Sequence, residues 1–215
     1  MHNRINRLNI RKTKRLITML LTTFALAGAT STADAQEVSV KTNLLYDATS
    51  TPNIGVEIGL RGRSTFNITY GLNPWEFDSD RHGKRYAKHW VVMPEYRWWP
   101  CARLTGHFFG VHAMGGQLNV SNIDLPAPGA FFNGPKLNDV GPDNRYQGAF
   151  AGGGLTYGYQ YPLSRHWNLE AEIGVGYAHV WYDRYPCSEC GTRLEKGGTN
   201  YAGLTKLGLS IMYVF

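Results

Sequence analysis

Residues 201–215 read Tyr-Ala-Gly-Leu-Thr-Lys-Leu-Gly-Leu-Ser-Ile-Met-Tyr-Val-Phe, and the sequence ends there. From Leu207 onward every second position is apolar: Leu207, Leu209, Ile211, Tyr213 and Phe215. A period of two indicates a β-strand with one apolar face and one less apolar face. Because the ends of soluble domains usually fray, so strong a pattern at the last residue favours a fold in which the final strand must be paired.

A transmembrane β-barrel makes that demand, since its last strand pairs with the first and leaves no unpaired edge in lipid. Tyr213 and the terminal Phe215 resemble the membrane-insertion signal that often ends bacterial outer-membrane barrels. The ending therefore predicts a signal peptide, alternating strands, aromatic girdles and polar loops in the rest of the chain.

The first 35 residues have the layout of a secretory signal peptide. Basic residues precede an apolar run from Leu16 to Ala27, and Ala33-Asp34-Ala35 is a small-x-small cleavage pattern before Gln36. The apolar run is short for a membrane-spanning helix, although an uncleaved N-terminal anchor is the alternative. We expect a signal peptide over 1–35 and one domain over 36–215.

The positive charge of the chain belongs mostly to this leader. Residues 1–35 hold six of the 22 basic residues and one of the 16 acidic residues, which leaves 16 against 15 in the mature domain. A nearly neutral domain gives no reason to expect a nucleic-acid partner. The 25 glycines and 13% aromatic residues suit curved strands that present rings at an interface.

Seven more stretches show the alternation of a strand: 37–47, 53–60, 65–72, 89–99, 107–119, 147–161 and 167–182. Pro94 interrupts the fourth and predicts a bulge or poor pairing there. With 201–215 the count is eight, so the predicted fold is all-β, an eight-stranded antiparallel up-and-down transmembrane β-barrel. Its internal turns would be 61–64, 100–106 and 162–166, and its external connections 48–52, 76–88, 120–146 and 183–200. Short internal and long external connections are typical of outer-membrane barrels with periplasmic termini.

The tryptophans agree with this topology, because all six fall near strand ends. We expect them to form aromatic girdles at the two membrane interfaces: Trp75, Trp90 and Trp181 outside, Trp98, Trp99 and Trp167 on the periplasmic side. Core or surface aromatics of a soluble domain would show no such segregation.

Seven charged residues have the parity of the barrel lumen: Lys41, Glu57, Glu95, Arg97, Glu170, Glu172 and Lys206. An eight-stranded barrel is just wide enough for side chains, and buried charges have to be paired. We therefore predict a polar network that fills the lumen. Glu170 and Glu172 also fit the pattern of paired catalytic carboxylates, although two glutamates on one strand face are more often ion-pair partners.

Two other groups could carry chemistry. Cys187 and Cys190 form a C-x-x-C pair, which we interpret as a loop disulfide. A zinc or redox site is the alternative, but zinc needs about four ligands and the chain has no second cysteine pair or adjacent histidine to supply them. Asp78, Asp80 and His82 could form a metal or lipid-hydrolase site, but the sequence shows no Ser/His/acid arrangement and a charged loop is the better interpretation. We expect no cofactor, no metal and no enzyme activity.

Six segments resemble one family: 41–48 (KTNLLYDA), 73–75 (NPW), 94–99 (PEYRWW), 106–110 (GHFFG), 167–170 (WNLE) and 185–192 (YPCSECGT). They are similar, in order, to the Bacteroidetes-type outer-membrane β-barrel proteins known as domain of unknown function 3575. The resemblance implies an outer-membrane location in a Gram-negative bacterium, often near fimbrial or surface-protein genes, and it supplies no catalytic residues.

The sequence therefore predicts a structural or surface-interaction role, with assistance to fimbrial or other surface-protein assembly as one form of it. Outer-membrane lipid and the barrel-assembly machinery are the expected partners, besides surface or fimbrial proteins. A membrane-embedded lipid-modifying enzyme is the alternative, and a small pore or ligand-binding barrel is a third reading that a filled lumen disfavours.

Overall fold

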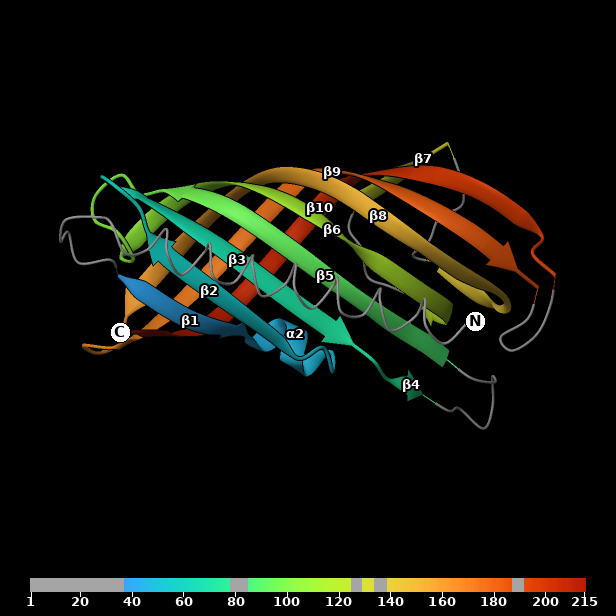
Figure 1. The fold of residues 1–215 in the computed structure, drawn as a ribbon, viewed down its shortest axis with the longest axis horizontal. Helices are drawn as coiled ribbons and strands as arrows, with labels where there is room; N and C mark the ends of the chain where they lie inside the picture. The colour runs from blue at the N-terminus through green and yellow to red at the C-terminus, as the bar shows by residue number, and fades with distance from the viewer. Residues whose placement is uncertain (1–36, 78–84, 125–128, 134–138, 187–191) are drawn as a thin grey trace, which may run out of the picture. The chain divides into compact units, whose positions relative to one another are not determined.

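The computed structural model describes residues 37–77, 85–124, 129–133, 139–186 and 192–215 (Figure 1). Eight antiparallel strands follow one another in chain order around a closed ring. They are β1 (Val38–Asn43), β2 (Asn53–Gly59), β3 (Ser64–Asn73), β5 (Arg85–Trp98), β6 (Gly106–Asp124), β8 (Asp139–Pro162), β9 (Trp167–Tyr185) and β10 (Glu195–Val214). The prediction of an all-β fold with eight antiparallel strands is confirmed, and the signal peptide expected over 1–35 lies outside the described residues.

The ring closes where β10 pairs with β1, from Ser39↔Val214 to Asn43↔Ser210. One further backbone hydrogen bond extends this seam, because the Phe215 amide donates to the carbonyl of Val38 at 3.0 Å. The last strand is thus paired to its end, as its alternation indicated. The described part of the chain contains no helix that is long and apolar enough to cross a membrane.

Side chains alternate between the inside and the outside of the ring, with polar groups inside. Along β3, the apolar side chains of alternate residues from Phe66 to Leu72 are exposed, while Asn67 and Thr69 are buried. Leu155 on β8 and Val175 on β9 keep 64% and 58% of their surface accessible. The outer face is therefore mainly apolar, and the interior holds buried polar and charged side chains together with two clusters of buried apolar residues.

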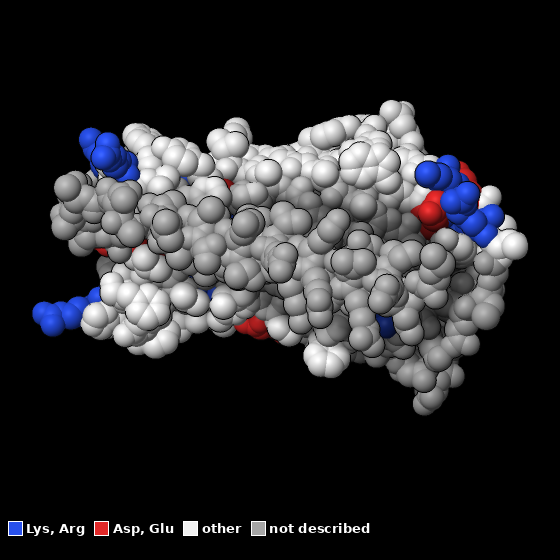
Figure 2. Space-filling model, viewed as in Figure 1, with Lys and Arg blue, Asp and Glu red and all other residues white. Residues whose placement is uncertain are grey.

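The ring has two different ends. The connections β2–β3, β5–β6 and β8–β9 are short and lie together with Phe215 at what we call the turn end (Figure 1). The opposite ends of the strands lie at what we call the loop end. In the view of Figure 2, Lys and Arg side chains gather at both ends of the described part, and most of the described surface that is visible between them is uncharged.

Strands reach much further toward the loop end than the alternation predicted. The stretch 120–146 was expected to be a loop, but β6 continues to Asp124 and β8 starts at Asp139, and the two remain paired as far as Asp124↔Asp139. The expected loop 183–200 is likewise shortened, since β9 ends at Tyr185 and β10 begins at Glu195. These extensions were missed because backbone ladders need no alternation of side chains beyond the apolar part of a strand.

Pro94 behaves as its missing N–H requires. The ladder between β5 and β6 runs to Val92↔Gly115 and resumes at Glu95↔His112 without a change of register. On the other edge, Pro94 still pairs with Ile68 of β3. The expected poor pairing is present, and no bulge accompanies it in this described segment.

Two short strands lie beside the ring. β4 (Glu76–Phe77) pairs with the start of β5, and β7 (Gly129–Phe132) pairs with β10 from Gly129↔Gly203 to Phe132↔Asn200. β1 is much shorter than β10 and pairs only with residues 210–214 of it. β7 therefore covers a part of the β10 edge that β1 does not reach.

The first strand ends earlier than predicted, and the Asn43 side chain makes the hydrogen bonds to β10 that the next strand residue would make. The strand predicted over 37–47 stops at Asn43, where the chain turns into α2 (Leu44–Ala48). The Asn43 side chain donates to Leu207 O at 3.0 Å and accepts from Leu209 N at 3.2 Å, so it mimics a backbone peptide against β10. The same oxygen accepts from Leu45 N and caps the helix.

Replacing Asn43 should therefore weaken the contact between the end of β1 and β10. Asn43→Ala removes the partners of Leu207 and Leu209 together, and we expect the free energy of unfolding to fall by about 1–3 kcal/mol, the cost of leaving buried polar groups unpaired. Urea titration followed by tryptophan fluorescence measures the change. Asn43→Asp keeps the acceptor oxygen and should lose less, so equal losses for both variants would contradict the double role of this amide.

Candidate functional site

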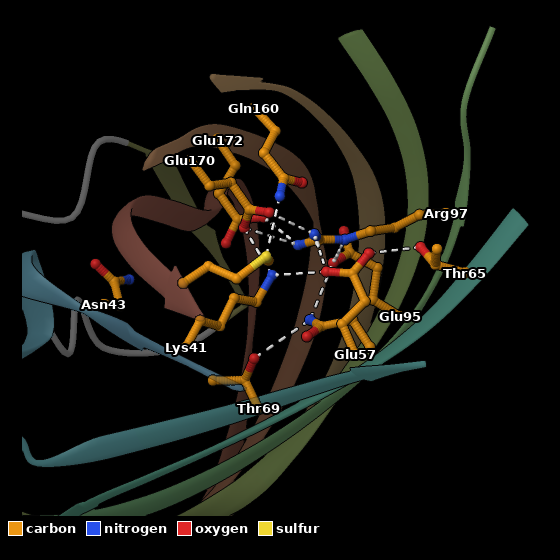
Figure 3. A network of polar contacts seen from close by, with 12 residues as sticks. Lys41, Asn43, Glu57, Thr65, Thr69, Glu95, Arg97, Gln160, Glu170 and Glu172 are labelled. Atoms are coloured by element: carbon orange, nitrogen blue, oxygen red, sulfur yellow. Dashed lines mark hydrogen bonds and ion pairs between the residues drawn. The ribbon is translucent and has the colours of Figure 1, made fainter. Parts of the chain in front are cut away.

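Arg97 on β5 is the centre of a charged cluster inside the ring (Figure 3). Its Nε donates to Glu95 Oε2 at 2.7 Å, and its Nη1 donates to Glu57 Oε2 at 2.8 Å. Nη1 and Nη2 grip Glu170 at 2.7 and 3.2 Å, and Nη2 also reaches Glu172 Oε2 at 2.8 Å. One guanidinium, itself fully buried, thus joins four carboxylates from three strands.

Two lysines complete the cluster from the strands that close the ring. Lys41 Nζ on β1 lies 3.1 Å from Glu57 Oε2 and 2.7 Å from Glu170 Oε1. Lys206 Nζ on β10 lies 2.7 Å from Glu95 Oε2 and 2.9 Å from Glu172 Oε2. The structure therefore brings together all seven charges that the lumen parity singled out.

These seven residues join β1, β2, β5, β9 and β10 across the interior, with three positive charges against four negative ones. Neutral donors add to the cluster: Thr65 Oγ1 donates to Glu57 Oε1 at 2.5 Å and Asn67 Nδ2 to Glu95 Oε2 at 3.3 Å. Among the described residues, Glu95 Oε1 and Asn67 Oδ1 are buried oxygens without a hydrogen-bond partner. Each of the seven charged groups nevertheless has at least one oppositely charged partner, as burial of a charge requires.

Close packing leaves little room beside the cluster. A Cβ on Gly110 would lie 2.6 Å from Glu95 Oε1, and a Cβ on Gly158 would lie 2.3 Å from Phe108 Cζ. Glycine is therefore the residue that lets these side chains occupy the interior at these two points. Alternating glycines in the strands were visible in the sequence, but which side chain each accommodates was not.

An apolar plug closes the interior at the turn end. Trp99, Leu104, Phe108 and Met212 pack together and are buried, and the Trp99 and Phe108 rings lie 4.9 Å apart between centroids. The Arg97 guanidinium lies over the Phe108 ring at 4.3 Å, which links the plug to the cluster.

The girdle prediction is wrong for Trp99. Its side chain is fully buried, and its indole Nε1 donates to Thr65 Oγ1 at 3.0 Å. Trp98 is outside, so the next residue of the chain has to face inward. The period of two along the strand indicates that Trp98 and Trp99 face opposite sides. The position of both tryptophans at a strand end suggested instead that both belong to the girdle.

The other tryptophans lie on the outer side. Four of them are exposed to about half of their surface: Trp75 (49%), Trp98 (49%), Trp167 (46%) and Trp181 (52%). Trp90 is partly exposed, and its indole donates to Gln117 Oε1 at 3.2 Å. The two residues of the expected insertion signal lie beside Trp167, since Tyr213 packs against Trp167 and Phe215 with centroids 5.2 and 5.1 Å apart.

Toward the loop end, Tyr46 of α2 covers the cluster. It lines a pocket of about 10 Å³, room for a single water molecule, together with Lys41, Glu172 and Lys206. Burial, and then the nearby Glu172 carboxylate, raise the pKa of Tyr46 to about 12. The phenol stays protonated at neutral pH, as an unperturbed tyrosine also does, and the Tyr46 side chain lies beside Lys41, Glu172 and Lys206.

A buried histidine extends the polar interior and was not predicted. His112 Nδ1 lies 2.8 Å from Thr156 Oγ1, and its Nε2 lies 2.9 Å from Thr205 Oγ1. Thr205 is the extra residue where the β9–β10 register shifts between Leu204 and Lys206. This irregularity turns Thr205 toward His112, and no period-two pattern could announce it.

The remaining candidate residues give little chemistry. Cys187 and Cys190, and likewise Asp78, Asp80 and His82, lie outside the described residues. Cys101 is an exposed free thiol on the β5–β6 connection. Among described residues no group of three or more His, Cys, Asp and Glu is arranged to hold a metal ion. The carboxylates of Glu170 and Glu172 accept bonds from Arg97, which is the geometry of ion-pair partners.

Arg97 is the substitution that should matter most. Arg97→Met leaves four carboxylates without their shared cation, and we expect a loss of about 3–5 kcal/mol in unfolding free energy, typical of a broken buried ion pair. Urea unfolding followed by tryptophan fluorescence measures it. Arg97→Lys keeps the charge but loses the forked contact and should recover only part of the loss.

A matched control is Arg103→Met, since Arg103 is an arginine near the same end whose partner Glu37 is partly exposed, at 3.5 Å. An exposed pair of this kind contributes about 0–1 kcal/mol. Equal losses for the two methionine variants would rule out a central role for Arg97.

The comparison with known protein families covers nearly the whole chain. Residues 18–215 match the family model described as Protein of unknown function (DUF3575), which confirms the family that the six sequence segments resemble. No curated protein and no solved structure matches the chain. The match spans every strand of the ring, and so the chain belongs to this family of proteins of unknown function.

Proposed function

We propose that this protein is an outer-membrane β-barrel of a Gram-negative, Bacteroidetes-type bacterium with a structural or surface-interaction role. The observation that carries the proposal is the polarity of the ring, in which charges are buried and the apolar side chains face outward. In water this outer surface would be far larger than the apolar patches that soluble monomers expose. In a bilayer it is the favourable arrangement.

The two ends of the ring fit an orientation in that membrane. The turn end, with its short connections and Phe215, would face the periplasm, and the loop end would face the outside. Exposed Trp98 and Trp167 would then mark the periplasmic interface, and Trp75, Trp90 and Trp181 the external one. Tyr213 and Phe215 would be the residues that the barrel-assembly machinery recognises.

The role proposed at the surface is recognition by the loop end, in the assembly of fimbrial or other surface proteins. The long hairpins β6–β8 and β9–β10 project furthest there and would supply the contact surface. The charge cluster, the apolar plug and Tyr46 occupy the interior, so transport through it is not part of this role. The cluster would instead keep the wall rigid while the loop end binds.

Adjacent tryptophans test the membrane assignment. In two single-tryptophan variants that retain only Trp98 or only Trp99, the protein is reconstituted into phosphatidylcholine vesicles whose acyl chains are brominated. Trp98 fluorescence should be strongly quenched by contact with the bromines, whereas buried Trp99 should not. The two residues lie at the same depth and serve as controls for each other, so equal quenching would refute the proposed outer surface.

Electrical recording tests the filled interior. Reconstituted protein in a planar lipid bilayer should show no steady large conductance, because Arg97 and its ion-pair partners occupy the interior. A porin reconstituted in the same way provides the positive control. Stable channels in the same range would show that the protein is a pore and would overturn the role proposed for the cluster.

A further inference from the structure

Two rows of side chains cross the outer face of the wall near the loop end. Strand pairing aligns Lys88 with Asn119, Asn119 with Gln147 and Gln147 with Asp183, across β5, β6, β8 and β9. The next row toward the turn end aligns Trp90, Gln117, Ala149 and Trp181 in the same way. Alternate residues of a strand share a face, so a row of amides and charges lies directly beside a row that has a tryptophan at each end.

A cavity of about 620 Å³ opens over one part of these rows. Its lining includes the row residues Lys88, Trp90, Gln117, Asn119, Gln147 and Asp183, their strand neighbours His89, Leu118 and Gly148, and the end of β3. This volume lies within the range of small-molecule sites, which usually combine an apolar surface with a few converging polar groups. The opposite end of the tryptophan row, at Trp181, does not belong to the lining.

Hydrogen bonds hold the polar groups of this cavity in place. The Trp90 indole donates to Gln117 Oε1 at 3.2 Å, and Arg145 Nε donates to Asn119 Oδ1 at 2.8 Å. In its better-satisfied orientation, Gln147 also accepts from Arg145, at 2.8 Å from Nη2. The amides are therefore fixed before any ligand arrives, which lowers the entropic cost of binding.

The chemistry of the lining selects among ligand classes. Primary amides both donate and accept hydrogen bonds, which matches hydroxyl groups that do both. Trp90 adds a partly exposed aromatic surface. Lys88 and Asp183 add charges of opposite sign, which together match a neutral polar ligand better than a purely anionic or cationic one. A purely apolar ligand would leave the amides unpaired.

A saccharide meets these requirements, since its hydroxyls face the amides while the C–H face of its ring covers the indole. We propose that this outer cavity is a saccharide-binding site. The argument depends on the cavity alone and not on the role proposed above. Membrane location decides only the source of the sugar: the headgroup of a glycolipid lying next to the wall, or a free surface polysaccharide that reaches it from outside.

Binding is tested by isothermal titration calorimetry on the purified full-length protein in detergent. Three probes are used: lipopolysaccharide from a Bacteroidetes species, the polysaccharide released from it by mild acid, and phosphatidylethanolamine as a lipid without sugar. We expect saturable binding of at least one sugar-bearing probe and none of phosphatidylethanolamine. Binding of the free polysaccharide identifies a glycan site, and binding of intact lipopolysaccharide alone identifies a headgroup site.

The variants are Trp90→Ala and the double variant Gln117→Leu/Asn119→Leu, each expected to weaken binding at least tenfold. The control is Trp181→Ala, which removes a tryptophan of the same row outside the cavity and should leave affinity unchanged. Unfolding midpoints of all variants check that each has folded. Absence of saturable sugar binding by the wild type, equal binding of phosphatidylethanolamine, or unchanged affinity in both folded cavity variants would overturn the proposal.

Discussion

The fold depends on one buried guanidinium. Arg97 holds Glu57, Glu95, Glu170 and Glu172 at hydrogen-bonding distance in an interior from which water is largely excluded. Without that cation the carboxylates would repel one another, and the strands that carry them could not close around so narrow a space. Ring closure and charge pairing therefore depend on each other, because the lysines that complete the cluster lie on β1 and β10, the two strands of the seam.

The same constraint explains how the interior divides along its length. Near the turn end an apolar plug covers the charges and excludes water from them. Near the loop end, Tyr46 reaches the interior from α2. This helix starts where β1 stops and where the Asn43 side chain takes the place of backbone pairing with β10. Because the interior is filled from both sides, the two proposals place binding on the outside of the ring, at the loop end and on the outer face. The proposed saccharide cavity lies on that outer face, where register alone aligns its amides.

Much of the charged cluster could be predicted, because each of its residues keeps the inward parity of an alternating strand. The contacts within it could not, since Arg97 meets Glu170 across a separation of 73 residues that no local pattern spans. The girdle prediction is wrong for Trp99 because the parity of a residue along the strand, and not its position near the strand end, decides whether its side chain faces inward. The predicted strand bounds are wrong toward the loop end because backbone pairing there continues through polar and glycine-rich segments that show no alternation.

By itself the sequence determined the class of fold, the number of strands in the ring and the inward position of the seven charged residues, because these follow from a local period of two. Tertiary structure alone decided how far the strands extend, where β1 becomes a helix, and that Thr205 turns toward His112. These features depend on which strand lies alongside which, and at what register. Pairing of this kind is a property of the closed ring as a whole, and no single segment encodes it.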